Sequence, residues 1–150
     1  MLYADHPPEQ LADQLGYLMN WAATRSRRAF VTALTPLGLS PPQYGLLVIA
    51  HANPGATQQQ LAELAQIDPS TMVARIDELE RAGLAERRPH PDDRRKRAIH
   101  LTARGEQELA RARAVAAQVG EDLLAPLSAR ERAEFTRLLH KLTGLSDRAA

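Results

Sequence analysis

Apolar residues recur at intervals of three and four over much of the chain, which is the spacing of one face of an α-helix. In the N-terminal stretch, from Glu9 to about Leu37, these residues fall close to a heptad repeat. This pattern predicts one long helix. A helix that extends beyond the core of its own chain commonly packs on another chain, so we expect residues 9–37 to take part in a homodimer.

Side chains that cap helices mark the beginnings of the next two helices. Ser40 and Thr57 each stand three residues before a glutamine, which is the spacing of a capping box. We expect the first of these helices to end at the turn sequence 53–55, and the second to end at about Gln66.

Another helix is predicted from about Pro69 to Ala82. Asp68 can cap its N-terminus, and Gly83 stands where helices commonly end in the left-handed conformation. Its apolar residues share one face, which we expect to be buried: Met72, Ile76 and Leu79. Only a short bend separates this helix from the one before it, so the pair is predicted to form a helix-turn-helix.

Two short segments after this unit, residues 84–88 and 97–101, have the composition of β-strands. Between them lies Pro89-His90-Pro91-Asp92-Asp93, whose residue types favour a turn. The sequence therefore predicts an antiparallel hairpin behind the helix-turn-helix, which makes the unit winged.

Two more helices are predicted after Thr102. The first must end before Pro126, because a proline ring is incompatible with a helix interior. Ser128 and Glu131 form a capping box that opens the second helix, and Gly144 ends it.

The expected fold class is therefore mainly α with a small β-hairpin wing. We expect a winged helix-turn-helix DNA-binding lobe over residues 40–102 and dimerisation helices over residues 9–37 and 102–145. Together these form a single domain that spans residues 1–150.

Positive charge is concentrated on the predicted hairpin. The whole chain is nearly neutral, with 19 lysine and arginine residues against 18 aspartate and glutamate residues. The cations of the hairpin are Arg87, Arg88, Arg94, Arg95, Lys96 and Arg97. Local charge of this kind, beside a helix with small hydroxyl residues at its N-terminus, indicates a site for double-stranded DNA. Two alternatives remain: a polar surface that is merely solvated, and a winged-helix protein-interaction module without a DNA operator, whose basic wing meets an acidic partner.

Several other classes of function find no support in the sequence. Cysteine is absent, which excludes disulfides and thiolate metal sites, and the five histidines lack metal-ligand spacing. No nucleophile elbow, glycine-rich phosphate loop or HExxH motif is present. We expect no cofactor, no metal site, no catalytic residue and no enzyme activity. The longest apolar run, Gly45 to Ala50, is too short to span a membrane, so we expect a cytoplasmic protein with no membrane partner.

The segment from Ser70 to Gly105 resembles the signature of the MarR (multiple antibiotic resistance regulator) family of transcription factors. The matching residues are Leu79, Gly83-Leu84, Glu86-Arg87-Arg88, Pro91, Asp93-Arg94-Arg95 and Leu101-Thr102. The helix order on either side agrees, so the resemblance covers about residues 9–144. It implies a homodimer whose winged lobes bind a pseudo-palindromic operator, with repression as the expected outcome.

The resemblance also implies roles for individual residues. In the wing, Asp93 would brace the loop and Arg95 would enter the minor groove. The residues expected in the major groove are Ser70, Thr71 and Arg75. Those expected to contact phosphates are Thr57, Gln59, Arg94 and Arg97, and Arg87 of the basic hairpin belongs to the same DNA-binding set.

Members of this family often bind small aromatic or phenolic anions in a cleft between the dimer helices and the winged lobe. The residues here that could line such a cleft are Tyr17, Trp21, Arg25, Arg28 and Tyr44. The four from the N-terminal helix lie on one side of it, where they could supply stacking and charge. The alternative is aromatic packing at a dimer seam, with the arginines on the surface.

Overall fold

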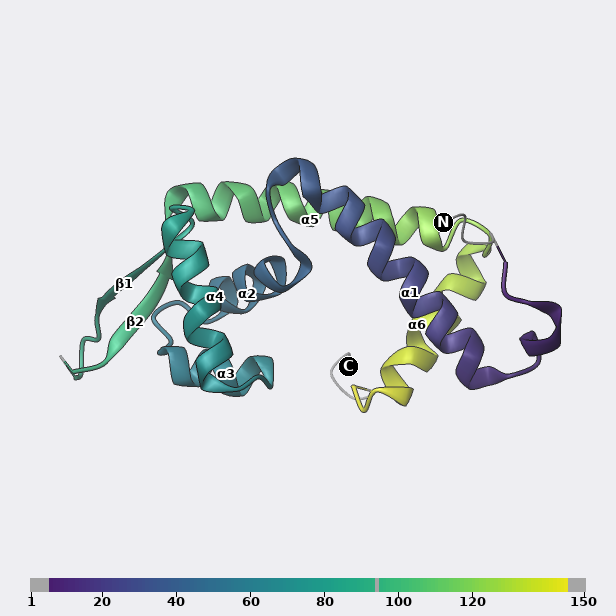
Figure 1. Cartoon of the computed structure of the whole chain (residues 1–150), viewed down its shortest axis with the longest axis horizontal. Helices are drawn as coiled ribbons and strands as arrows, with labels where there is room; N and C mark the ends of the chain where they lie inside the picture. Colours follow the sequence, from purple (N-terminus) through teal and green to yellow (C-terminus); the bar gives the residue numbers. More distant parts are fainter. Residues whose placement is uncertain (1–5, 94, 146–150) are drawn as a thin grey trace.

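The computed structural model describes residues 6–93 and 95–145, which form helices and one two-stranded antiparallel hairpin, as the sequence predicts. The main elements in chain order are α1 (Leu15–Leu34), α2 (Pro41–Ala52), α3 (Gln58–Ala65), α4 (Pro69–Arg81), β1 (Ala85–Pro89), β2 (Arg97–Leu101), α5 (Ala103–Leu123) and α6 (Ala129–Leu142). Helices α2, α3 and α4 gather with the hairpin in one lobe, and α5 runs from that lobe toward α6 (Figure 1). None of the described helices is long and apolar enough to cross a membrane.

The first long helix is shorter than the sequence predicts. Instead of one helix over residues 9–37, the structure has a 3-10 turn at Glu9–Leu11, then α1, and then a second 3-10 turn at Thr35–Leu37. Gln14 adopts an extended backbone with φ -90° and ψ 100°, which separates the first turn from α1.

The physical reasons for this correction lie at both ends of α1. Between Glu9 and Gln14 only Leu11 has a large apolar side chain, so little packing would stabilise a further helical turn. At the other end Pro36 has no N–H to donate within an α-helix, and it is accommodated in the tighter turn instead.

The predicted N-caps of α2 and α3 are confirmed. The Ser40 hydroxyl accepts a hydrogen bond from the N–H of Gln43 at 3.4 Å, and the Thr57 hydroxyl accepts one from the N–H of Gln60 at 3.3 Å. In both helices the glutamine side chain accepts the N–H of the capping residue in return, which completes a capping box.

Helix α4 closely follows the prediction. Ala82, predicted as its last residue, is instead the C-cap, and Gly83 follows in the left-handed conformation with φ 70°. The N–H of Leu84 donates to the carbonyl of Leu79 at 2.8 Å, as in a Schellman motif. Because Leu84 closes the helix in this way, β1 begins at Ala85, one residue later than predicted.

The hairpin is attached to the lobe at its root. β1 and β2 pair from Ala85 opposite Leu101 to Pro89 opposite Arg97. The N–H of Ile99 donates to the carbonyl of Ala56 at 2.9 Å, so β2 is hydrogen-bonded to the segment between α2 and α3. The wing therefore leaves the lobe from a fixed position beside α4.

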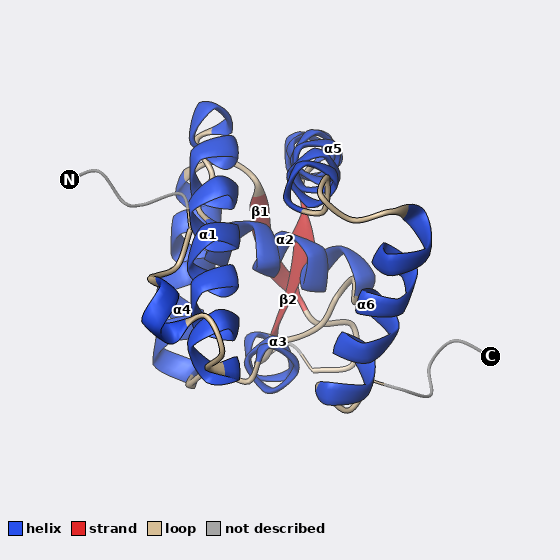
Figure 2. Cartoon of the chain, turned by 90° about the vertical axis from the view of Figure 1, so that its right-hand side faces the viewer, coloured by secondary structure: helices blue, strands red, loops and turns tan. Residues whose placement is uncertain are grey.

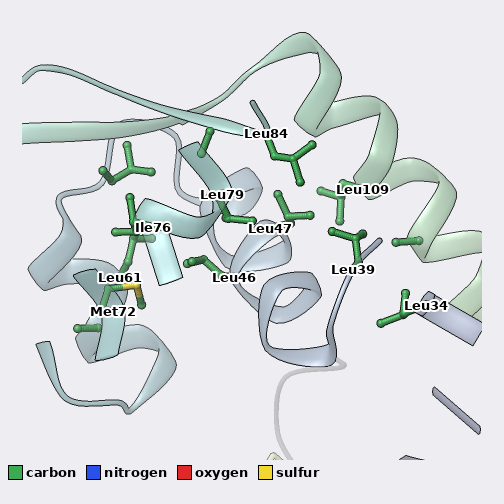
Figure 3. Close-up of a cluster of buried hydrophobic side chains, with 14 residues drawn as sticks. Leu34, Leu39, Leu46, Leu47, Leu61, Met72, Ile76, Leu79, Leu84 and Leu109 are labelled. Atoms are coloured by element: carbon green, nitrogen blue, oxygen red, sulfur yellow. The ribbon is translucent and has the colours of Figure 1, made fainter. Parts of the chain in front are cut away.

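One hydrophobic core holds the lobe together, and α5 packs onto it (Figure 3). The predicted inner face of α4 is confirmed, since Met72, Ile76 and Leu79 are at most 1% exposed. Leu109 of α5 is equally buried and lies beside Leu47 of α2 and Leu84 (Figure 3). This packing fixes α4 and the wing relative to α5.

Helices α1 and α6 leave apolar surface uncovered at the end of the molecule away from the wing. Figure 2 looks at this end and shows the two helices as separate arms. No residue of α6 is buried. The exposed large apolar residues of the two helices are Leu15, Leu18, Met19, Val31, Phe135, Leu138, Leu139 and Leu142. Exposed large apolar side chains gathered on two helices are typical of an interface with another chain.

Candidate nucleic-acid interface

The N-terminus of α4 is organised around the carboxylate of Asp68. It accepts hydrogen bonds from the N–H of Thr71 at 2.8 Å and from the hydroxyls of Ser70 and Thr71, each at 2.5 Å. These hydrogen bonds hold the pKa of Asp68 far below its usual value, and those from the two hydroxyls have the largest effect. The side chain is nevertheless fully exposed. Because both hydroxyls already donate to Asp68, what they can still offer a ligand is acceptor lone pairs.

Arg75 lies one turn further along α4. It is half-buried, and no ion pair involves it among the residues the structure describes. Ser70, Ala74 and Glu78 are exposed on the same helix. The face that the sequence predicts for DNA is therefore accessible, with an arginine whose charge is not neutralised by a neighbouring carboxylate.

The tip of the wing is shaped by Asp93. Its carboxylate accepts a hydrogen bond from the N–H of Arg95 at 2.9 Å, and its carbonyl accepts one from the N–H of Lys96 at 2.9 Å. This is the geometry that the expected bracing role requires. The side chains of Arg95, Lys96 and Arg97 are exposed and make no ion pair within residues 6–93 and 95–145. Arg94, also predicted to bind phosphate, lies outside the described residues.

Arg87 is placed differently from the arginines at the tip. Its Nη2 lies 2.7 Å from Oδ1 of Asp77, and its Nη1 pairs with the carboxylate of Glu80, so both partners come from α4. Its backbone N–H also donates to Oε1 of Glu80 at 2.9 Å. Arg88, the next residue, pairs with Glu86 of its own strand. Among the described residues of the hairpin, Arg87 and Arg88 are thus paired with carboxylates, whereas Arg95, Lys96 and Arg97 are not.

Thr57 and Gln59 stand at the N-terminus of α3. The Thr57 hydroxyl belongs to its capping box, and the backbone of Thr57 forms a β-bridge with Ala98 of β2. The Gln59 side chain is exposed and donates to Glu63 one turn along the helix at 3.2 Å. Both residues are therefore held in place, and Gln59 stays accessible to a ligand.

Three residues that the sequence does not single out as functional hold the interface together. Asp77 and Glu80 form ion pairs with Arg87. The Thr102 hydroxyl donates to the carbonyl of Gly83 at 2.7 Å, and this hydrogen bond joins the start of α5 to the end of α4. The three-residue spacing of Asp77 and Glu80 places both on one side of α4, and this was an available signal. Nothing in the sequence says which of the hairpin arginines would meet them.

The residues predicted to bind an aromatic ligand do not all come together within one protomer. Tyr17 and Trp21 stack, with ring centroids 6.2 Å apart and an angle of 25° between the planes. Tyr44 packs edge-on against Phe30 instead, with centroids 5.2 Å apart. Phe30 lies about 20 Å further along α1 than Tyr17, given the rise of a helix.

The two predicted arginines lie on the same helix as the stack. Arg25 and Arg28 are both exposed. Tyr17, Trp21 and these arginines form one candidate patch on α1, to which Tyr44 does not belong in a single chain. The described residues contain no group of three or more His, Asp or Glu side chains that could hold a metal ion.

A family model and the sequences of known proteins both relate this chain to one family of transcriptional regulators. A model of the MarR family matches residues 39–96, which run from the end of the α1–α2 connection to the tip of the wing. A helix-turn-helix transcriptional repressor from Mycobacterium tuberculosis is 36% identical over 134 residues, which cover 88% of this chain and 96% of the relative.

Solved structures agree in fold over almost the whole chain. The crystal structure of a Mycobacterium tuberculosis MarR family protein in complex with DNA matches with a TM-score of 0.75 and 35% identity, over 85% of this chain and 96% of that one. The transcriptional repressor CouR bound to a 23-mer DNA duplex matches with a TM-score of 0.81 and 32% identity, over 93% and 99%.

Two further solved structures contain small molecules. The mycobacterial protein in complex with salicylic acid matches with a TM-score of 0.70 and 34% identity, over 93% of this chain and 99% of that one. CouR from Rhodococcus jostii RHA1 bound to p-coumaroyl-CoA matches with a TM-score of 0.75 and 28% identity, over 90% and 95%.

Proposed function

The chain belongs to the MarR family of transcriptional regulators, and from this premise we propose that it represses transcription by binding a pseudo-palindromic DNA operator as a homodimer. Residues 40–102 form the DNA-binding lobe, and residues 9–37 and 102–145 form the dimerisation region. We assign the protein no catalytic activity, and because its partner is DNA we place it in the cytoplasm.

One observation carries this proposal: accessible cations stand at both places where a winged helix meets DNA. Arg75 on α4 and Arg95 and Arg97 on the wing make no ion pair among the described residues. Arginine is well suited to guanine edges, to phosphates and to a narrow minor groove. In support, two similar repressor-family proteins were solved with DNA.

The N-terminus of α4 suggests what kind of base edge it reads. Ser70 and Thr71 donate their hydroxyl hydrogens to Asp68, so they are left as acceptors. In the major groove the exposed donors are the amino groups of adenine and cytosine. We therefore expect Ser70 and Thr71 to face an adenine or a cytosine.

The experiment that tests the proposal is fluorescence anisotropy of the protein on the DNA upstream of its own gene and on scrambled DNA, over a salt series. Arg95→Ala should weaken binding to the upstream DNA by about 10- to 100-fold and reduce the preference over scrambled DNA. Arg97→Ala should weaken binding to both DNAs equally. It should also make the slope of log K against log salt concentration less steep by about 0.9 for each protomer, because one phosphate contact is lost. Weak, equal binding of wild type to both DNAs would contradict the proposal and favour a protein-interaction module.

A small aromatic or phenolic effector is the second part of the proposed function. The stacked pair of Tyr17 and Trp21 supports it, with the exposed Arg25 on the same helix available for a carboxylate. The relatives solved with salicylic acid and p-coumaroyl-CoA support it as well. Such a ligand releases DNA only if it binds the DNA-free form of the dimer more tightly.

The effector can be tested directly because Trp21 is the only tryptophan of the chain. Titration with benzoate should change the tryptophan fluorescence and lower the affinity for DNA, whereas benzyl alcohol, which has the same ring without the charge, should act more weakly. Arg25→Ala should remove the difference between the two compounds. Identical weak responses to both compounds in wild type would contradict an anion-binding site on α1.

A further inference from the structure

We infer that Arg87 is a positioning residue, which fixes the wing to α4 and does not itself contact DNA. This inference rests on the proposed function, because it assigns a part within the DNA-binding lobe. It revises the expectation from the sequence, which places Arg87 among the residues that touch DNA.

The contacts of Arg87 all lead to one helix. Its guanidinium is 2.7 Å from Asp77 and also pairs with Glu80, while its backbone N–H donates to Glu80 at 2.9 Å. Glu80 thus holds both the main chain and the side chain of the same strand residue. On the other side of β1, Arg87 is paired in register with Ile99, which is 1% exposed. The strand is therefore held between β2 and α4.

The positive charge of this guanidinium is already neutralised by its ion pairs with Asp77 and Glu80. Its side chain is only 21% exposed, compared with 57% for Arg88. Two carboxylates surround one guanidinium, so the cluster carries a net negative charge. A phosphate would have to displace these carboxylates, and it would be repelled by them while they stay ionised. A direct contact between Arg87 and DNA is thus disfavoured by the geometry.

The position of this cluster explains what it does. At its root the wing is tied to the segment between α2 and α3 through Ile99 and Ala56. The Arg87 cluster is a second attachment, which joins β1 to the helix that carries Ser70, Thr71 and Arg75. Two attachments prevent the hairpin from rotating about either one. Arg95 at the tip can then stand at a fixed distance from the N-terminal turn of α4, as a rigid docking surface requires.

The decisive variant keeps Arg87 and removes its partners: Asp77→Asn with Glu80→Gln. This change frees the guanidinium and removes two negative charges next to the DNA-binding face, so a phosphate-binding Arg87 predicts tighter binding to the upstream DNA. A positioning Arg87 predicts weaker binding, by about fivefold or more. The two roles thus predict opposite signs, and tighter binding would overturn the inference.

Arg87→Ala and Arg88→Ala form a matched pair, since each removes one arginine from β1. Arg88→Ala gives the loss of affinity due to charge alone, and Arg87→Ala should lose clearly more. In the Arg87→Ala background, a further Arg95→Ala change should hardly alter the affinity for DNA, because a displaced wing no longer brings Arg95 to the DNA. In the same background, Thr71→Ala should weaken DNA binding as much as it does in wild type. Additive losses for Arg87 and Arg95 would contradict the positioning role.

Amide hydrogen exchange of the DNA-free protein separates this inference from the proposed function. The Asp77→Asn, Glu80→Gln variant should lose protection in β1 and β2, while amides of α5 around Leu109 keep theirs. If wild type does not bind DNA selectively but the variant loses amide protection in the hairpin, the proposed function is contradicted while the attachment of the wing through Arg87 is supported. Unchanged exchange in the hairpin would overturn the inference whatever the DNA measurements show.

Discussion

At the scale of single residues, Asp68 links the stability of α4 to pH. Hydrogen bonds from Ser70 and Thr71 lower the pKa of Asp68 in the folded protein below the ordinary value of about 3.9 that applies to the unfolded chain. A carboxyl with a lowered folded pKa contributes stability that is fully present above the unfolded pKa and is lost as the pH falls through the folded pKa.

Asp68→Asn should therefore lower the melting temperature by a constant amount above about pH 5. The difference from wild type should shrink as the pH falls below about 4, because Asp68 then takes up a proton in the unfolded wild-type chain but stays ionised in the folded protein, which favours unfolding. Thermal melts of both proteins between pH 3 and pH 8 would check this. A difference that stays constant down to about pH 3 would show that the charge of Asp68 is unimportant.

Gly105 is the glycine at which space is most restricted. A Cβ at this position would lie 2.0 Å from the carbonyl oxygen of Leu84, so the start of α5 could not approach the end of α4. Gly105→Ala should cost about 3 kcal/mol or more of the free energy of unfolding. Gly120 lies in the same helix with nothing within 4 Å, and Gly120→Ala should be neutral or stabilising, by at most about 1 kcal/mol. Equal effects of the two changes in urea denaturation would contradict this packing.

The sequence could predict those site residues whose roles are local. Ser40, Thr57 and Asp68 act on backbone N–H groups a few residues away, so composition and spacing were sufficient. Arg87 could not be assigned in this way, because its partners are seven and ten residues distant on another element. The chain contains several hairpin arginines, and only the folded register decides which of them faces α4.

At the scale of elements, α4 depends on the row of apolar residues that it buries. Ile76 lies in the middle of this row and is 0% exposed. Ile76→Ala should lower the free energy of unfolding by about 2–5 kcal/mol, through lost burial and the cavity left behind. Urea denaturation at a fixed protomer concentration would measure this loss, since dimerisation makes the stability depend on concentration. A loss below about 1 kcal/mol would show that the core does not hold α4.

Element boundaries were predictable where a chemical stop is present. Gly83 and Gly144 end their helices in the left-handed conformation, and Pro126 lies beyond the end of α5. The start of α1 has no such marker, and the heptad pattern alone placed it six residues too early, at Glu9 instead of Leu15. Helical periodicity tells which face would be buried, but the packing that stabilises the last turn depends on the rest of the molecule.

At the scale of the whole molecule, the exposed apolar surface of α1 and α6 predicts a second copy of the chain. A two-fold dimer would bury Leu138, which is 48% exposed, against the same region of its partner. Leu138→Asp should shift the protein toward monomer in analytical ultracentrifugation at micromolar concentration. Leu64 on α3 is similarly exposed, at 54%, but lies in the winged lobe, so Leu64→Asp should leave the dimer intact. Dissociation by both variants, or by neither, would contradict the assignment of the interface.

The most direct test of a dimeric, sequence-reading repressor is selection of DNA duplexes from a random library by the purified wild-type protein. Two α4 helices related by a two-fold axis would read half-sites about 10 base pairs apart, centre to centre. We expect the enriched sequences to form an inverted repeat with this spacing, and adding about five base pairs between the half-sites should abolish tight binding. Enrichment of no sequence, or of a single half-site that tolerates any spacing, would contradict the proposal that this protein reads DNA as a symmetric dimer.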